Sequence, residues 1–193
     1  MKIGVIGLGM VGEAVAFGLQ WVGHTVVGYD RNPDKNQSPA SELAATEMIF
    51  VCVPTPPSGP DGSCDISAIE SVISNLKRDR YWGLVVIKST VTPGTTERLA
   101  KYSGLRLAFC PEFLRERARF SDFVDNHELC VAGVFSEPDA LLIRKAHGDL
   151  PKHFVQMTPT EAELAKYFVN CFNAQRVVFA NAFYDVCKTL GAD

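Results

Sequence analysis

The stretch "KIGVIGLGMVGEAVAFGL", residues 2–19, decides the fold of this chain. It opens with a short, mostly apolar run, which is typical of a strand covered on both faces. Gly7, Gly9 and Gly12 follow within six residues, and apolar side chains at helical spacing come next. This order predicts a strand, a tight turn and a helix, which is the first unit of a parallel sheet.

The same alternation continues along the chain. Seven short apolar runs predict strands: KIGVIG, TVVGYD, MIFVCVP, LVVIKS, LRLAFCP, HELCVAGV and HFVQM. Four segments between them are compatible with helices: MVGEAVAFGLQWVG, DISAIESVISNLK, GTTERLAKY and EPDALLIRKAHG. We therefore predict an α/β fold with a doubly wound, mostly parallel sheet in residues 1–157. Segments 53–65 and 110–126 are predicted to be loops at the carboxyl ends of strands, where such sheets bind ligands.

The pattern changes after "TPT", residues 158–160. Thr160 and Glu163 predict a capping box that starts a helix. Eight apolar side chains then recur at helical spacing as far as Gly191: Leu164, Phe168, Cys171, Phe172, Phe179, Phe183, Val186 and Leu190. Roughly 30 residues of helix span about 45 Å, too long for one more crossover. We expect residues 158–193 to form a long central helix, with Lys166 and Asn170 one turn apart on the same face.

Composition excludes several classes of partner. The net charge of the 193-residue chain is −3 and its basic residues are scattered, so nucleic acid is not expected to bind. No stretch reaches the ~18 apolar residues that a membrane span needs. The six cysteines show no C-x-x-C spacing and mostly lie in apolar runs. Buried free thiols in a reducing compartment are the better interpretation, which places the protein in the cytoplasm.

The motif "GLGMVG", Gly7 to Gly12, has the context that a dinucleotide-binding turn requires. A strand precedes it, a helix follows it, and Asp30 ends the second strand 18 residues beyond Gly12. The glycines allow a tight turn and a close backbone approach, so that a pyrophosphate can lie on the helix N-terminus. Asp30 would accept a hydrogen bond from the adenosine ribose and select NAD over NADP. The alternative is a glycine-rich turn followed by a surface aspartate.

Three further polar groups lie at predicted strand ends or on the long helix. Ser89, Thr90 and Thr92 belong to "KSTVTPGTT", where simple helix capping is an equal alternative. Glu112 and Glu116 of "PEFLRE" could orient a water or bind substrate hydroxyls, or be solvated loop acids. A lysine can hold a developing alkoxide and an amide can orient a substrate, which gives a role to Lys166 and Asn170. A solvated lysine beside a polar asparagine is the alternative.

The motifs "GLGMVG", "VCVPTP", "DGSCDIS", "KSTVTPGTT", "PEFLRE" and "EAELAKYFVNCFNA", in this order, resemble the UDP-glucose/GDP-mannose dehydrogenase family over essentially the whole chain. This resemblance implies an N-terminal Rossmann-type domain that binds NAD and a long central helix that leads to a C-terminal domain. It also implies a reaction that oxidises the C6 alcohol of a nucleotide sugar to a carboxylate in two NAD-dependent steps. Members pair through the central helix, so we expect a homodimer through residues 160–190.

The resemblance implies a role for each candidate residue. The expected NAD contacts are Gly7, Gly9, Met10, Val11, Gly12, Asp30, Lys35, Thr55 and Thr90. Phe113, Leu114 and Arg115 would lie along the nucleotide sugar, which Lys166 and Asn170 would also bind. Glu112, Glu116, Thr90, Lys166 and Asn170 are the expected catalytic residues. No metal ligand is expected.

The chain departs from the family pattern in two places. Only 17 residues separate Asp30 from "MIFVCVPTP", where relatives carry a longer helix and loop. Relatives also place a nucleophilic cysteine, which forms a thiohemiacetal in the second oxidation, in a later G-F-G-G-x-C-type segment that this sequence lacks. The chain is then the NAD-binding half with part of the sugar site. The alternatives are a cysteine-independent dehydrogenase of the 3-hydroxyacid or 6-phosphogluconate type, and a non-catalytic NAD-binding module.

Overall fold

The computed structural model describes residues 1–60 and 62–192. Asp61, the first residue of the "DGSCDIS" motif, and Asp193 lie outside the described residues. The seven predicted apolar runs all form strands of one sheet: β1 (Lys2–Ile6), β2 (Thr25–Tyr29), β3 (Met48–Val51), β6 (Leu84–Ile87), β7 (Leu107–Phe109), β8 (Leu129–Gly133) and β9 (His153–Met157). The prediction of a doubly wound, mostly parallel sheet is confirmed.

The strand order of this sheet is β2-β1-β3-β6-β7-β8-β9. Five neighbouring pairs are parallel, and β7 pairs with β8 in the antiparallel direction through Phe109 and Gly133. The chain moves outward from β1 first through β2 and then through β3. The carboxyl ends of β1 and β3 are therefore the switch point at which open α/β sheets bind ligands.

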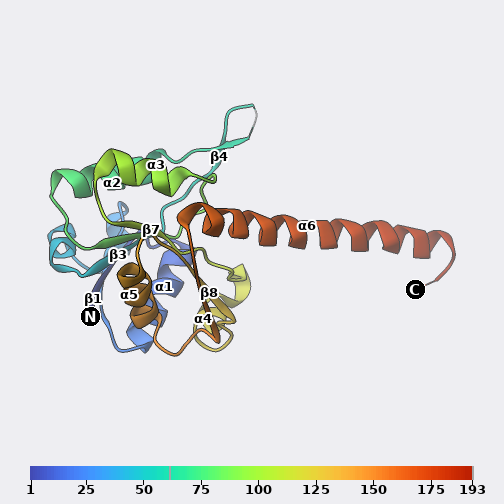
Figure 1. Cartoon of the computed structure of the whole chain (residues 1–193). Helices are drawn as coiled ribbons and strands as arrows, with labels where there is room; N and C mark the ends of the chain where they lie inside the picture. The colour runs from blue at the N-terminus through green and yellow to red at the C-terminus, as the bar shows by residue number, and fades with distance from the viewer. Residues whose placement is uncertain (61, 193) are drawn as a thin grey trace.

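Helices cover both faces of the sheet (Figure 1). On one face lie α1 (Met10–Trp21), α4 (Arg119–Val124) and α5 (Glu137–His147), and on the other lie α2 (Ser67–Arg78) and α3 (Thr95–Ser103). Each face has its own hydrophobic core, because successive strand side chains point to opposite faces. Ile3, Val5 and Phe50 belong to the first core, and Ile49, Val51 and Val85 to the second.

The connection between β2 and β3 is made of residues 30–47. It contains two 3₁₀ turns, η1 (Pro33–Lys35) and η2 (Ala40–Ala45), in place of an α-helix. Leu43 is the buried side chain of η2, and it packs into the second core. The 17-residue spacing seen in the sequence is therefore accommodated by two tight turns.

The long segment 110–126 is not one loop, which corrects the prediction. After Pro111 it forms η3 (Glu116–Ala118) and then α4. The ring of Phe123 is buried against Gly18 of α1, and Phe120 makes an edge-on contact with Phe17. These apolar contacts explain why the segment is helical. The other predicted loop carries a small hairpin, β4 (Pro57–Ser58) with β5 (Ser63–Cys64).

The last element, α6 (Pro159–Thr189), projects away from the rest of the molecule (Figure 1). Its buried residues are Pro159, Ala162, Glu163 and Lys166, all in its first two turns. The predicted capping box of Thr160 and Glu163 is wrong, since Thr158 and Glu161 form it. Pro159 fits the first helical position and shifts the start by two residues. Within the part of the chain that the structure describes, no helix is long and apolar enough to cross a membrane.

Candidate cofactor and substrate site

The turn between β1 and α1 has a separate steric reason for each of its glycines. Gly7 has a φ of +90°, and a Cβ there would lie 2.7 Å from the carbonyl oxygen of Cys52. A Cβ on Gly12 would lie 1.8 Å from the carbonyl oxygen of Gly7. Gly9, in contrast, has open space in front of it, and it caps α1 without a side-chain hydrogen bond. The N–H groups of the first turn of α1 are thus left to a ligand at this position.

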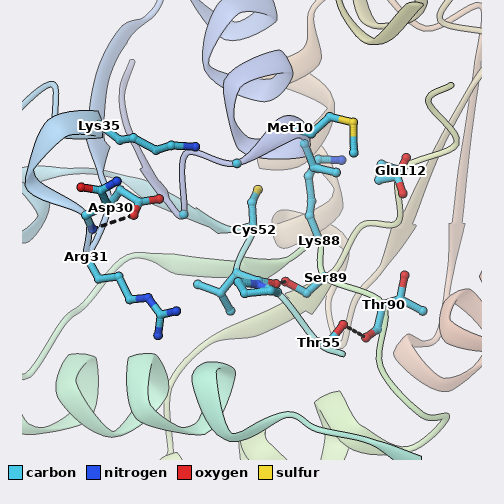
Figure 2. A pocket seen from close by; sticks show the side chains of 16 residues that line it. Met10, Asp30, Arg31, Lys35, Cys52, Thr55, Lys88, Ser89, Thr90 and Glu112 are labelled. Carbon is cyan, nitrogen blue, oxygen red and sulfur yellow. Dashed lines mark hydrogen bonds between the residues drawn. The ribbon is translucent and has the colours of Figure 1, made fainter. Parts of the chain in front are cut away.

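Asp30 lies at the end of β2 beside this turn. Its carboxylate accepts hydrogen bonds from the backbone N–H of Leu8 at 2.7 Å and of Asn32 at 2.8 Å. The short crossover brings Lys35 to the same place, where its Nζ donates to the carbonyl oxygen of Leu8 at 3.2 Å. Asp30, Arg31 and Lys35 occupy one end of a cavity of about 540 Å³ (Figure 2).

The other end of this cavity is formed by the polar ends of β3 and β6 (Figure 2). The Thr55 hydroxyl donates to the carbonyl oxygen of Thr90 at 2.8 Å, and the Ser89 hydroxyl donates to that of Val53 at 2.6 Å. These two bonds hold the "VPTP" and "KST" segments together. Thr55 and Thr90 therefore shape the cavity wall, and the Thr90 side chain remains free of these bonds. The full lining is Gly7, Gly9, Met10, Val11, Asp30, Arg31, Asn32, Lys35, Cys52, Val53, Pro54, Thr55, Lys88, Ser89, Thr90 and Glu112.

A second cavity of about 550 Å³ begins where the first one ends. Lys88 and Glu112 line both cavities. Lys166 of α6 is buried at this junction, and its Nζ donates to the Glu112 carboxylate at 2.9 Å and to the Glu112 carbonyl oxygen. The same ammonium lies 5.5 Å from the centre of the Phe113 ring. The junction thus presents a buried ammonium and a carboxylate between the two spaces.

The structure separates two residues that the sequence places together. Lys166 points inward to Glu112, whereas Asn170, one turn further along α6, is exposed. Its side-chain amide makes no hydrogen bond within residues 1–60 and 62–192, whereas its backbone belongs to the α6 helix. Val169 and Asn173 of α6 line the second cavity instead. Asn170 therefore does not converge on Glu112 in this structure.

The remaining residues of "PEFLRE" divide between the cavities. Phe113, Leu114 and Arg115 line the second cavity, and Glu116 is exposed beside a small space of about 80 Å³ near Met10. The Arg115 guanidinium is bound to Asp122 at 2.6 Å, so it anchors the segment to α4. These hydrogen bonds from Arg115 lower the pKa of the Asp122 carboxyl.

Two residues of the site were missed by the sequence analysis. Lys88 directly precedes Ser89 at the end of an apolar strand, and it is 3% exposed at the junction of the cavities. Glu163 is fully buried and accepts hydrogen bonds from the backbone N–H groups of Gly94 and Thr96 at the start of α3. Lys88 could have been found as a candidate, because a lysine directly after a fully apolar strand is at the edge of the sheet where ligands bind. Glu163 was hidden by its assignment to the capping box.

The glycine turn at the switch point, Asp30 beside it and the polar ends of β3 and β6 define the dinucleotide-binding domain of a dehydrogenase. Comparison with protein families narrows this class. Residues 36–150 match the NAD-binding domain of the UDP-glucose/GDP-mannose dehydrogenase family, and residues 160–193 match its central domain. The chain belongs to this family, which confirms the resemblance. Residues 2–57 also match the family described as NADP oxidoreductase, coenzyme F420-dependent.

Individual relatives agree with this assignment. The chain is 30% identical to the UDP-glucose 6-dehydrogenase AglM of Haloferax volcanii and 29% identical to the GDP-mannose 6-dehydrogenase of Pseudomonas aeruginosa. Both alignments cover the whole of this chain. They cover 56% of the length of the H. volcanii protein and 54% of the length of the P. aeruginosa protein. The solved UDP-glucose dehydrogenase of Pyrobaculum islandicum superposes with a TM-score of 0.86 at 33% identity, over the whole chain and 54% of that structure. The chain thus spans about half the length of the relatives it matches.

The cofactor is NAD, as the family's domain requires. The residues present fit it. Uncapped N–H groups at the start of α1 and open space at Gly9 suit a pyrophosphate, and the Asp30 carboxylate suits a ribose diol.

Proposed function

We propose that this chain is the cofactor-binding half of a nucleotide-sugar 6-dehydrogenase, which oxidises the C6 alcohol of UDP-glucose or GDP-mannose to a carboxylate. The observation that carries the proposal is the junction at Glu112, which lines both cavities and is paired with the buried Lys166. A bound NAD accepts a hydride. At the junction, a sugar carbon in the second cavity would lie next to a cofactor in the first cavity, so that the hydride could pass between them.

Each proposed role follows from charge and position. Lys166, desolvated and cationic, stabilises negative charge on an oxygen at the junction. Glu112 orients a hydroxyl or a water there, with Thr90 on the neighbouring wall and Glu116 at the rim. Phe113, Leu114 and Arg115 form the wall along which the nucleotide sugar lies. Asn170 takes part only after α6 or the substrate segment moves toward it.

The proposed division of the chain follows the same arrangement. The proposed NAD-binding domain is residues 1–157, and the proposed second unit, residues 158–193, contains the helix α6 that carries Lys166. A cysteine-independent 3-hydroxyacid-type reaction is the rival. The 3-hydroxyisobutyrate dehydrogenase of Mycobacterium tuberculosis has a TM-score of 0.78 at 16% identity, which reflects the fold alone. The family match favours the nucleotide-sugar reaction.

Ligand binding tests the proposal directly. Calorimetry should show NAD binding, and UDP-glucose or GDP-mannose should raise the melting temperature further once NAD is present. Lys166→Met should remove the sugar-dependent shift and leave NAD binding within about threefold, because Lys166 does not line the first cavity. A shift with 3-hydroxyisobutyrate or 6-phosphogluconate, and none with either nucleotide sugar, would replace the proposal with its rival.

Cofactor choice depends on Asp30. Asp30→Ala should lower NAD affinity about 10- to 100-fold, since a charge-assisted hydrogen bond to the ribose is lost. Affinity for NADP should change less, because Arg31 and Lys35 remain at the same end of the cavity. Asp34→Ala, which removes an exposed acid of the same crossover outside the cavity lining, is the matched control. Equal affinity of the unmodified chain for NAD and NADP would contradict this role.

The 193-residue chain alone should not convert the alcohol to the acid. The second oxidation needs a thiolate beside the sugar C6. Burial raises the pKa of Cys52 to about 12, so its thiol stays protonated, and the buried Cys110 and Cys130 line neither cavity. Cys64 contacts the carbonyl oxygen of Thr90 from the hairpin side. Sustained NADH formation from either nucleotide sugar, with the uronic acid as product, is the result that would refute this expectation.

Self-association is the last part of the proposal. Beyond Asn170 almost every side chain of α6 is exposed, including Phe172, Phe179 and Phe183. At about 25 cal/mol per Å², leaving this apolar surface in water is unfavourable by several kcal/mol. A two-fold contact would bury it against a second copy. Light scattering should give twice the 21.1 kDa of one chain, and Phe179→Glu should return the mass to that of a monomer. The control is Trp82→Glu, which replaces an exposed aromatic side chain in the connection between α2 and β6.

A further inference from the structure

Three side chains with soft or borderline metal-binding atoms meet in the core beneath β7, β8 and α5. Cys110 directly follows β7, Cys130 belongs to β8, and His147 ends α5. All three are buried, and their Sγ and imidazole nitrogen atoms lie within 4.8 Å of one another. None of them takes part in the cofactor or sugar chemistry described above.

The tautomer of His147 leaves one nitrogen without a well-aligned hydrogen bond. Its Nδ1 lies 2.9 Å from the carbonyl oxygen of Ile143, which can only accept, so Nδ1 carries the proton. Nε2 then presents a lone pair. It is buried and makes no well-aligned hydrogen bond in the part of the chain that the structure describes, where the Cys110 thiol is a polar side chain that interacts with this imidazole. An imidazole that donates one nitrogen to a backbone carbonyl and offers the other is the usual state of a metal-binding histidine.

We propose that Cys110, Cys130 and His147 bind one monovalent copper ion in a three-coordinate site. The two Sγ atoms lie 3.9 Å apart. Two sulfur atoms held at about 120° around one ion, with metal–sulfur bonds of about 2.3 Å, would be ~4.0 Å apart. The sulfur positions therefore already fit the ion, and the Nε2 lone pair supplies the third ligand.

Charge favours a monovalent ion over zinc. The Nζ of Lys88 lies 3.5 Å from the Sγ of Cys110 and 3.1 Å from its carbonyl oxygen, and Lys88 makes no ion pair with a carboxylate of the described residues. Two thiolates, one Cu⁺ and the Lys88 ammonium sum to zero charge. Zinc in the same site would leave a buried positive charge, and it would also lack the fourth ligand that structural zinc sites have.

A disulfide between the two cysteines fits less well. The register pairs Phe109 with Gly133, and its extension would place Cys110 opposite Ala132. Cys130 is then a diagonal neighbour, for which Cα atoms lie about 7–8 Å apart. A disulfide needs a Cα separation below ~7 Å. Metal binding needs no such approach: each thiol that coordinates releases its proton to solvent, and no electron is transferred.

The position of the site gives the ion a structural effect. Among the described residues, β8 and β9 join the rest of the sheet through one bridge, between Phe109 and Gly133. An ion held by Cys110, Cys130 and His147 would connect both sides of this bridge to α5. Because it would bind the folded chain only, it would raise the melting temperature.

The test uses a variant in which Cys52, Cys64, Cys171 and Cys187 are all replaced by serine, so that Cys110 and Cys130 are its only thiols. Anaerobic titration with Cu⁺ against a chromophoric Cu⁺ chelator should give one bound equivalent per chain. Cys110→Ser or Cys130→Ser in this background should weaken binding at least 100-fold. X-ray absorption should show two sulfur ligands and one nitrogen ligand.

Three results would overturn the proposal. The first is no Cu⁺ binding by the serine variant, and the second is stoichiometric zinc binding without copper binding. The third is ready oxidation of Cys110 and Cys130 to a disulfide, without copper binding. If the serine variant does not fold, X-ray absorption on the unmodified chain decides. Two sulfur ligands with one nitrogen ligand support the site, and sulfur ligands alone exclude it.

Discussion

Replacing Gly12 by alanine is expected to abolish measurable NAD binding. The added Cβ would lie 1.8 Å from the carbonyl oxygen and 2.9 Å from the carbonyl carbon of Gly7, and both are backbone atoms. Relief of this clash must move the turn or the start of α1. The N–H groups that we propose to hold the pyrophosphate would then lose their common direction. We expect calorimetry to show a loss of at least about 100-fold, equivalent to ~2.7 kcal/mol.

Gly9→Ala separates binding from folding and serves as the matched control. Its Cβ would meet no atom within 4 Å, so the melting temperature of the free chain should stay unchanged. The same methyl group would enter the space in front of α1, so NAD affinity should still fall. Gly12→Ala should lower both quantities. If Gly12→Ala binds NAD as the unmodified chain does, the turn does not hold the pyrophosphate in the way described.

Replacing Glu163 by alanine is expected to destabilise the fold by about 3 kcal/mol or more. The buried carboxylate accepts three hydrogen bonds, from the backbone N–H groups of Gly94 and Thr96 and from the Thr96 hydroxyl, at 2.6–2.8 Å. The cap residue of α3, Gly94, has no side chain that could replace them. Each buried donor left without a partner costs about 1–3 kcal/mol.

Glu161 provides the comparison on the same helix. It forms the capping box with Thr158 and is exposed, so Glu161→Ala should cost only about 1 kcal/mol. Urea unfolding of both variants measures the difference. If Glu163→Ala lowers the free energy of unfolding by only about 1 kcal/mol, as expected for Glu161→Ala, Glu163 is dispensable for joining α6 to α3. A large loss in Glu163→Ala alone would show that the attachment of α6 depends on this buried carboxylate.

Much of the fold could be predicted from local sequence, because its signals are local. Each strand of the large sheet is a short apolar run, and the glycine turn has a strand before it and an acid at the end of the next strand. The first residue of α6 could also have been predicted from the sequence. Both T-x-x-E pairs of "TPTEAE" satisfy the capping-box pattern, and Pro159 at the first helical position selects Thr158 as the cap.

The parts that could not be predicted depend on contacts between distant residues. The partners of Glu163 lie 67 and 69 positions earlier, and Lys166 meets Glu112 across 54 positions. The spacing of apolar residues along the sequence gives no information about such distant pairs. Spacing alone put Lys166 and Asn170 on one helix face, but the helix is only partly covered, so one side chain is buried and the other exposed. In the sequence, Lys88 is only the residue that follows an apolar strand. Its position at the junction of the two cavities follows from tertiary contacts.

The short crossover after β2 also affects the tendency of this sheet to aggregate through its edge strands at high protein concentration. β2 is an edge strand, and an edge with unpaired carbonyl groups invites strand-to-strand aggregation. The backbone N–H groups of Gln37 and Ser38 both donate to the carbonyl oxygen of Gly28, so the crossover itself occupies part of this edge. The opposite edge, β9, displays Val155 at 39% exposure. Unwanted strand pairing should therefore begin at β9, and a charged residue in place of Val155 should suppress it.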